Sequence, residues 1–303
     1  MDKIAIIIVH YNTNEDTLET LESLESVDTS GLKVKTYVVD NGSVPSLVLP
    51  SKWAKKVRLL RSDSNLGFAG GNNLGFETAS REFDPEYFLL LNSDTLVQPD
   101  FLQKLYQALQ HHPDWGLATP KMYFAPGCEF HRHDYGKKQQ GHVIWFAGGS
   151  IDWDNLLTIH QGVDEVDRGQ FSQEATMTFA TGCCFLIRRE ILANVGVFDE
   201  RYFLYYEDVD LSWRVRHHNF LLGFVPQAII WHKNGGSSQG SGSDLQTFYQ
   251  TRNRLLFFSE RGDILVKLRT WRLSWRLWRH GSAVEKKAVK CFWSRQFGKQ
   301  AII

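Results

Sequence analysis

The sequence predicts an α/β fold with a mostly parallel central sheet flanked by helices, and three observations lead to this prediction. In the first hundred residues, short apolar runs alternate with segments of helical spacing, as in successive βαβ units. Loop carboxylates follow three apolar runs of the chain, at Asp40, Asp94 and Glu207-Asp208. Such residues gather at the carboxyl edge of a parallel sheet, where open α/β folds bind ligands. After residue 260 the chain is basic and rich in tryptophan, which predicts a C-terminal helical extension.

The expected elements follow in chain order. Residues 4–9 form an unbroken apolar run, typical of a strand that is buried on both faces. Further strands are expected at residues 34–39, 57–60, 87–91, 179–187 and 221–225. Helices are expected after Asn14 or Asp16, from Pro99 to about residue 111, and over residues 208–217 and 245–260. Residues 120–180 should form hairpins and long loops, and residues 235–243 a flexible Gly/Ser-rich loop.

Composition and charge limit the class of protein. The 303 residues are 43% hydrophobic and 22% charged, as in ordinary globular proteins. The net charge of zero is unevenly distributed. After residue 260, eleven Lys and Arg face two acids, so this segment carries +9 and residues 1–260 carry −9. The asymmetry predicts an anionic surface as a partner. Because no stretch approaches 18 apolar residues, the chain is not expected to cross a bilayer.

Asp40 ends a strand and precedes Asn41-Gly42-Ser43. A carboxylate there would accept hydrogen bonds from a nucleobase N–H or from ribose hydroxyls. The alternative is turn chemistry alone, because Asp-Asn-Gly sequences are common in turns.

The glycine-rich segment NLGFAGGNNLG, residues 65–75, has neither Walker A spacing nor the position of a dinucleotide fingerprint. Gly67, Gly70 and Gly71 would let the backbone approach a ligand at the start of a helix. An ordinary glycine turn that opens a helix explains the segment equally well.

Asp94 follows the apolar run FLLL, so a buried strand would hold it at the cleft. A carboxylate oxygen in that place suits Mg²⁺ or Mn²⁺ bridging phosphates, whereas the alternative is a helix cap. His232 ends another apolar run and would complete a metal site, or it is a structural histidine.

Glu207 and Asp208 follow the aromatic run FDERYFLYY. An apolar environment raises the pKa of a carboxyl group, which is how a general base near neutrality is made. The alternative is a helix N-terminus, where acidic residues are common.

Seven segments stand in a characteristic order: IIIVHYN, VVDNGS, NLGFAGGNN, LLLNSDT, TGCCFLIRR, FDERYFLYYEDVDLSWR and IIWHKNGGSS. Over roughly residues 3–260 this series resembles the family 2 glycosyltransferases of the GT-A fold, in particular rhamnosyltransferase-like bacterial enzymes of polysaccharide assembly. In LLLNSDT, Asn92 stands where the Asp-x-Asp form of the motif has its first acid. This departure leaves one carboxylate, Asp94, and an Asn that can coordinate through its carbonyl.

The resemblance and the residue patterns together assign the site. Asp208 and Glu207 are expected to be catalytic, with Asp208 as the base, and Asp94 and His232 to bind the metal. The residues expected to bind the nucleotide sugar are Tyr11, Asn12, Asp40, Asn41, Gly67, Asn72, Asn73, Asn92 and Arg252.

The resemblance implies a function as well. It is the inverting transfer of a sugar, preferably rhamnose, from a dTDP- or UDP-linked donor. The acceptor would be a hydroxyl of a growing bacterial surface glycan or lipid-linked glycan, and Mg²⁺ or Mn²⁺ would be the cofactor. A sugar-phosphate nucleotidyltransferase is an alternative, but it should carry a Gly-rich loop where this chain has His10-Tyr11-Asn12-Thr13. The other alternative is a catalytically inactive subunit that binds nucleotide or glycan.

The basic tail, residues 261–303, is expected to extend a GT-A domain of residues 1–260. Between residues 264 and 279, one helical stripe is apolar (Ile264, Leu268, Trp271, Trp275, Trp278), and a neighbouring stripe holds Arg269, Arg272, Arg276 and Arg279. Tryptophan beside arginine is typical of a helix in a membrane interface, so we expect a cytoplasmic enzyme that binds the inner face of the plasma membrane. A second apolar stripe, Val266, Leu273 and Leu277, favours packing on the catalytic domain or on a second copy of the chain. Nucleic acid is not expected as a partner, since no binding motif accompanies the charge.

Overall fold

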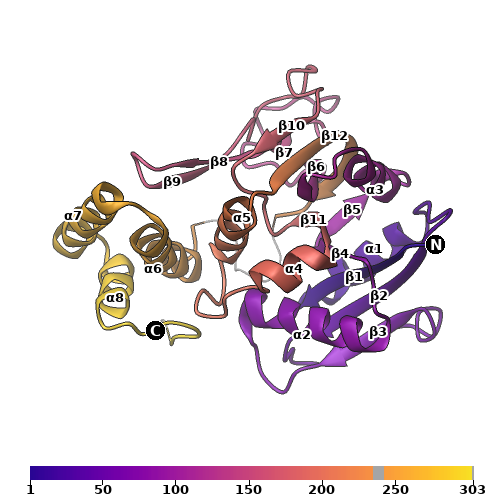
Figure 1. Cartoon of the computed structure of the whole chain (residues 1–303), viewed down its shortest axis with the longest axis horizontal. Coiled ribbons are helices and arrows are strands. Elements are labelled where there is room, and N and C mark those ends of the chain that lie inside the picture. The colour runs from indigo at the N-terminus through magenta and orange to yellow at the C-terminus, as the bar shows by residue number, and fades with distance from the viewer. Residues whose placement is uncertain (235–241, 302–303) are drawn as a thin grey trace.

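The structure is a computed structural model that describes residues 1–234 and 242–301 (Figure 1). Its strands are β1 (Lys3–His10), β2 (Lys33–Asp40), β3 (Val57–Arg61), β4 (Tyr87–Leu91), β5 (Thr95–Val97), β6 (Trp115–Phe124), β7 (Ile144–Phe146), β8 (Gly149–Asp152), β9 (Leu157–His160), β10 (Ala175–Met177), β11 (Cys184–Arg188) and β12 (Leu221–His232). Its helices are α1 (Asn14–Leu24), α2 (Gly67–Glu82), α3 (Phe101–His111), α4 (Arg189–Val195), α5 (Glu207–His217), α6 (Asp244–Arg261), α7 (Ile264–His280) and α8 (Ala283–Trp293). The α/β class is confirmed. Most of the loop expected at residues 235–243 lies outside the described residues.

Ten strands of the described chain form one sheet, and β8 and β9 form a separate hairpin. In the large sheet, β1 is parallel to β2 and β4, β2 to β3, and β6 to β12. β11 lies between β4 and β6 and is antiparallel to both. The sheet is therefore mixed, and only its N-terminal half is parallel throughout. A long irregular segment leads into β11 instead of a crossover helix, so the geometry that keeps βαβ strands parallel does not act on it.

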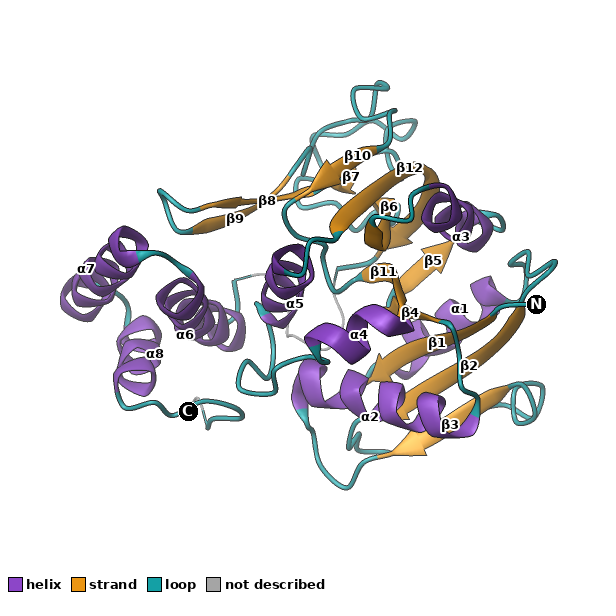
Figure 2. Cartoon of the chain, in the orientation of Figure 1, coloured by secondary structure: helices purple, strands orange, loops and turns teal. Residues whose placement is uncertain are grey.

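The apolar runs of the sequence become the centre of the molecule. β1 lies between β2 and β4, with Ile4 to Ile8 buried, and all five residues of β4 are buried. α2 packs on β1 and β2, α3 on β6 and β12, and α4 on β11, so helices flank the sheet as expected (Figure 2).

Strand register brings the candidate residues together at the carboxyl edge. His10 and Asp40, the last residues of β1 and β2, are paired in register. β12 runs antiparallel to the short strand β5, and His232 is paired with Thr95. His232 is thereby placed beside Asp94, although 138 residues separate the two in the chain.

Two strands differ from their predicted bounds by more than one residue. β12 continues past residue 225 to His232, because the sheet accommodates Pro226 at a register shift between Val225 and Ile229. Residues 179–183 are irregular, and β11 begins only at Cys184. The backbone N–H of Gly182 donates to the Asp208 side chain instead of to a neighbouring strand. α4 has no counterpart among the predicted elements, and α8 lies in the segment predicted only as a helical extension.

α6, α7 and α8 pack on one another and lie to one side of the sheet (Figure 1). The chain after α8 returns to α6, where the carbonyl of Gly298 accepts a 2.7 Å hydrogen bond from Arg252. The expected boundary at residues 260/261 coincides with the end of α6, so the extension packs directly on the last helix of the proposed catalytic domain. No helix within the described residues is long and apolar enough to span a bilayer.

Candidate active site

A cavity of about 630 Å³ opens at the carboxyl edge of the sheet. Eight of the predicted site residues line it: Tyr11, Asn41, Gly67, Asn92, Asp94, Glu207, Asp208 and His232. The other five do not: Asn12, Asp40, Asn72, Asn73 and Arg252. Residues separated by more than 200 positions in the chain therefore share one cavity.

Asp94 and His232 form an acid–imidazole pair in the cavity wall. Nε2 of His232 lies 3.1 Å from Oδ1 of Asp94, and both side chains are buried. The Trp145 ring packs against the imidazole with its centroid 4.4 Å away, and Nδ1 of His232 has no hydrogen-bond partner among the described residues. The pair is held rigidly by β5, β12 and the Trp145 ring.

Asp94 and His232 together offer two ligand atoms for a metal ion. Within the described residues, no group of three or more His, Cys, Asp or Glu side chains is arranged to hold a metal. Asp94 and His232 offer one carboxylate oxygen and one imidazole nitrogen, which suit Mn²⁺ or Mg²⁺ when a bound ligand supplies further oxygens. The residues present therefore fit a metal shared with a ligand and do not fit a structural metal.

Asp208, the second residue of α5, presents its carboxylate to the cavity. Oδ2 accepts a 2.7 Å hydrogen bond from the backbone N–H of Gly182, and Oδ1 accepts one of 2.8 Å from Val209. The residues before α5 have left-handed backbones, with φ of 65° at Phe203, 67° at Tyr205 and 72° at Tyr206. For non-glycine residues this costs on the order of 1–3 kcal/mol each, and such strain is concentrated at functional sites. The strained turn aims the first turn of α5 at the cavity.

Glu207 and Asp208 are neighbours in different environments. Burial, and then the charge of Asp208, raise the pKa of Glu207 well above its usual range, and its Oε2 has no hydrogen-bond partner among the described residues. Burial also raises the pKa of Asp208, but hydrogen bonds from the Gly182 and Val209 N–H groups oppose the shift. Such hydrogen bonds favour the ionised form. Glu207 is thus the neutral member of the pair, and Asp208 is the one able to accept a proton.

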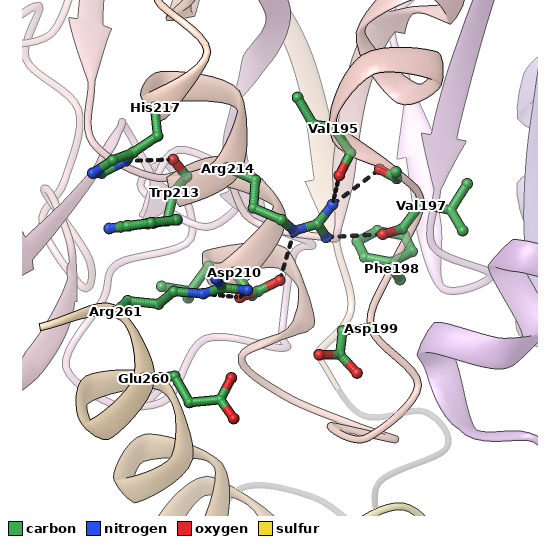
Figure 3. A network of polar contacts seen from close by, with 12 residues as sticks. Val195, Val197, Phe198, Asp199, Asp210, Trp213, Arg214, His217, Glu260 and Arg261 are labelled. Carbon is green, nitrogen blue, oxygen red and sulfur yellow. Dashed lines mark hydrogen bonds and ion pairs between the residues drawn. The ribbon is translucent and has the colours of Figure 1, made fainter.

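A buried ion-pair network fixes α5 (Figure 3). Asp210, fully buried in the first turn, accepts 2.8 Å hydrogen bonds from Arg214 and from Arg261, the last residue of α6. Arg214 also donates to the carbonyls of Gly196 and Val197 after α4. The network joins α4, α5 and α6 behind Asp208. The partners of Asp210 are distant in the sequence, so the local sequence marks it only as an acid in the first turn of a helix.

Asp40 and Asn41 occupy different positions at the end of β2. The Asp40 carboxylate is buried and accepts hydrogen bonds from the N–H groups of Ser43 and Leu47 and from the Arg61 guanidinium. Burial opposes ionisation of Asp40, but these hydrogen bonds and the Arg61 charge outweigh it and lower the pKa. Asp40 thus holds the turn together in this structure and does not line the cavity. Asn41 does line the cavity.

Gly67 allows the start of α2 to lie close to the backbone of Phe203 in the loop before α5. Its φ is +77°, and a Cβ at this position would lie 2.3 Å from the carbonyl oxygen of Phe203. The same carbonyl accepts a 2.7 Å hydrogen bond from the N–H of Phe68 in the first turn of α2. This N–H is therefore not free to hold a phosphate, and the glycine serves contact with the loop before α5.

Three asparagines expected to bind the nucleotide sugar form hydrogen bonds within the protein. Asn12 accepts a hydrogen bond from the N–H of Val44. Asn72 donates within α2 to the carbonyl of Phe68. Asn73 exchanges two hydrogen bonds with the backbone of Phe198. None of the three lines the cavity.

Arg252, which was expected to contact a diphosphate, is fully buried and does not line the cavity. Its guanidinium donates to the carbonyls of Arg201, Tyr202 and Gly298. It fastens the C-terminal segment and the loop before α5 to α6. Arg254, similarly, donates to the carbonyls of Asn155 and Leu156 in the β8–β9 turn.

The family model for glycosyl transferase family 2 matches residues 5–196. The chain belongs to this family. The match runs from β1 to the end of α4, so it includes Asp94 and Gly182 and stops before Asp208. The resemblance inferred from the seven segments is confirmed.

Two relatives of this family 2 glycosyltransferase align over most of its length. N-acetylglucosaminyl-diphospho-decaprenol L-rhamnosyltransferase of Mycobacterium tuberculosis is 35% identical over 277 residues, which cover 86% of this chain and 85% of the relative. dTDP-rhamnosyl transferase RfbF of Shigella flexneri is 23% identical over 268 residues, which cover 84% of this chain and 79% of the relative.

A solved structure shows the same fold. GalNAc-T7, crystallised with UDP, GalNAc and Mn²⁺, superposes with a TM-score of 0.59 at 14% identity, over 92% of this chain and 58% of that chain. This chain thus spans little more than half of that structure. The likeness confirms the expected GT-A fold of this family 2 glycosyltransferase.

Several cavity residues of the glycosyltransferase were not expected from its sequence. Trp145 lies in β7, His160 in β9 and Phe179 in the loop before β11. Tyr249 comes from α6 and Lys299 from the C-terminal tail. Burial lowers the pKa of His160 to about 4, so its imidazole is neutral. No motif or periodicity marks these residues, since only the folding of the loops and the tail brings them to the cavity.

Proposed function

We propose that this glycosyltransferase is an inverting, metal-dependent enzyme that transfers rhamnose from dTDP-rhamnose to a hydroxyl of a lipid-linked glycan. The observation that carries the proposal is one cavity shared by an oriented carboxylate, Asp208, and the Asp94–His232 pair. Asp208 is suited to remove a proton, and the Asp94–His232 pair is suited to bind the leaving diphosphate through a metal.

Asp208 acts as the general base in this proposal. Gly182 and Val209 hold its two oxygens, leaving lone pairs to accept the proton of an acceptor hydroxyl. As the acceptor hydroxyl loses its proton, its oxygen attacks the anomeric carbon. The bond from that carbon to the diphosphate breaks on the opposite face, so the configuration is inverted. General-base help of this kind contributes on the order of 10² to 10⁴ in rate.

One ionised carboxylate is sufficient for such a transfer. A retaining, double-displacement route would need a nucleophile as well as an acid–base group. Glu207, the neighbour of Asp208, is held neutral by burial and is a poor nucleophile in that state. The environments of the two carboxyl groups therefore favour inversion.

Asp94 and His232 would hold the metal, and Asn92 lies in the same cavity lining. When bound, the metal would neutralise negative charge on the departing nucleoside diphosphate. The Mn²⁺ in the GalNAc-T7 structure supports a divalent metal for this fold.

The names of the relatives support the substrates. Two relatives are rhamnosyltransferases, one named for a dTDP-linked sugar and the other for a diphospho-decaprenol acceptor. The larger identity belongs to the second, which favours a lipid-linked acceptor.

The test is a panel of dTDP-, UDP- and GDP-sugars incubated with the purified chain, with Mn²⁺ or with EDTA. We expect binding of dTDP-rhamnose and slow, Mn²⁺-dependent release of dTDP. Release that persists in EDTA would contradict metal dependence. Absence of binding and release across the whole panel would contradict the transferase proposal.

A further inference from the structure

α7 has one face that is buried against the protein and one that is largely exposed, on which Trp271 and Trp275 pack only partly against α8. Val266, Thr270, Leu273 and Ser274 are buried, and α7 packs with α6 and α8. This is the second apolar stripe of the sequence, so the packing expected from that stripe exists within the chain itself.

The opposite face of α7 is exposed and apolar. Ile264 is 69% exposed and Trp275 60%, and Leu265, Leu268 and Trp271 are also exposed. Large side chains exposed in a contiguous group commonly mark an interaction surface, whereas isolated ones do not. The residues recur at helical spacing from residue 264 to residue 275 of α7, so they form such a group.

The charge along this face has a single sign. α7 contains no Asp or Glu, and its exposed basic residues are Lys267, Arg269, Arg272, Arg276 and Arg279. Arg269 pairs with Asp154 at 2.7 Å. Among the described residues no acid lies within ion-pair distance of Arg272, Arg276 or Arg279. The arginines therefore have charge available for an external anionic partner.

We propose that the exposed face of α7 docks on the surface of an anionic lipid bilayer, with the helix axis parallel to the membrane plane. Trp271 and Trp275 would enter the interfacial region, where amphipathic indole rings are favoured, and the arginines would contact lipid phosphates. A second copy of the chain fits this face poorly, because isologous packing of two α7 helices sets arginine against arginine.

The position of α7 relative to the cavity supports this occupant. The turn of the β8–β9 hairpin is joined to α7 by the Arg269–Asp154 pair, and Figure 1 shows the hairpin reaching toward α7. Along β9, Leu157 and Ile159 are exposed and alternate with Thr158 and His160, which line the cavity. One strand thus connects the docked face to the cavity. Delivery of a lipid-linked acceptor along this strand rests on the proposed function, whereas docking itself does not.

The experiment is co-sedimentation of the full chain with phosphatidylcholine vesicles, with and without phosphatidylglycerol. We expect binding to the anionic vesicles only, weakened by high salt. The triple variant Arg272→Gln, Arg276→Gln and Arg279→Gln should bind roughly a hundredfold more weakly, since each basic residue near such a surface contributes about 1 kcal/mol. The double variant Trp271→Ala and Trp275→Ala should also lose binding.

A matched control removes three exposed positive charges elsewhere, Arg132→Gln, Lys137→Gln and Lys138→Gln, and should bind as the wild type does. Equal loss in this control would show attraction by net charge and overturn the assignment to α7. A concentration-dependent dimer that the double variant dissociates, without vesicle binding, would assign the face to a second copy and overturn the proposal.

Turnover of the donor in solution separates this inference from the proposed function. All α7 variants should release nucleoside diphosphate from the donor at the wild-type rate. Vesicle binding without any donor turnover would contradict the proposed function and leave the docking proposal intact. Donor turnover without vesicle binding would contradict the docking proposal and leave the proposed function intact.

Discussion

The backbone N–H of Gly182 donates a 2.7 Å hydrogen bond to Oδ2 of Asp208. This contact links the entry to β11 with the first turn of α5 and orients the carboxylate that we propose as the base. A Cβ at Gly182 would lie 2.9 Å from the Phe68 ring and 3.5 Å from the Asp208 Cβ. A larger residue at position 182 would therefore have to displace the Phe68 ring or shift the backbone.

Gly182→Ala should reduce sugar transfer without preventing folding. The added methyl group displaces either the Phe68 ring or the 182 backbone and so lengthens the hydrogen bond to Asp208. We expect transfer to fall on the order of tenfold, about 1.4 kcal/mol of barrier, with the donor Kd nearly unchanged. Gly136→Ala is the control, because a Cβ there meets only the Gln139 side chain at 3.5 Å. Equal activity of both variants would show that the contact is not needed for transfer.

Glu207→Gln should change how stability depends on pH. The folded state holds the Glu207 proton above the ordinary pKa of 4.5, whereas the unfolded state releases it. The unfolded state then binds fewer protons, so the free energy of unfolding falls as pH rises above 4.5, by up to about 1.4 kcal/mol per pH unit. Urea unfolding of the variant between pH 5 and 7 should show a shallower decline than the wild type.

The exposed Glu77→Gln variant provides the control for this pH series and should decline as the wild type does. Parallel curves for all three proteins would mean that Glu207 is ionised in the folded state.

Asp94→Ala and His232→Ala should raise the Mn²⁺ concentration that gives half-maximal donor binding. Each variant removes one of two protein ligands, and we expect a shift of at least tenfold for Asp94, which supplies the charge. Calorimetric titration of donor at graded Mn²⁺ measures the shift. Mn²⁺ dependence identical to the wild type in both variants would exclude this pair as the metal site.

Arg252→Ala should unfold the protein at lower denaturant concentration without affecting donor binding in the molecules that remain folded. It removes a fully buried guanidinium from three backbone carbonyls, which costs on the order of 3 kcal/mol. Arg58→Ala, which breaks an exposed pair with Glu82, should cost less than about 1 kcal/mol. Unchanged stability with a weaker donor Kd would restore Arg252 to the diphosphate.

The parts of the fold that local sequence encodes were predictable. The apolar run at residues 4–9 could only be a buried strand, and β1 lies at the centre of the sheet. The reversed direction of β11 was not predictable, since no local signal says how a long irregular segment returns to a sheet. Likewise, β12 passes through Pro226, a residue that ordinarily ends a strand.

The candidate site divides in the same way. Asp94 and Asp208 stand at the ends of recognisable elements, and both line the cavity. The contact of His232 with Asp94 depends on the pairing of β5 with β12, which is a long-range register. Arg252 and Asp40 show the limit of residue type as a guide. Both bind the protein's own backbone, and their partners are too distant in the sequence for a local motif to indicate them.

The measurement that tests the central claim most directly is the rate of sugar transfer by Asp208→Asn, together with its donor Kd in Mn²⁺. The amide keeps the shape of the side chain but cannot take up the acceptor proton, so we predict a loss of 10² to 10⁴ in rate with a donor Kd within about threefold of the wild type. A variant that retained most of its transfer activity, or that lost activity only through weaker donor binding, would contradict the assignment of Asp208 as the base.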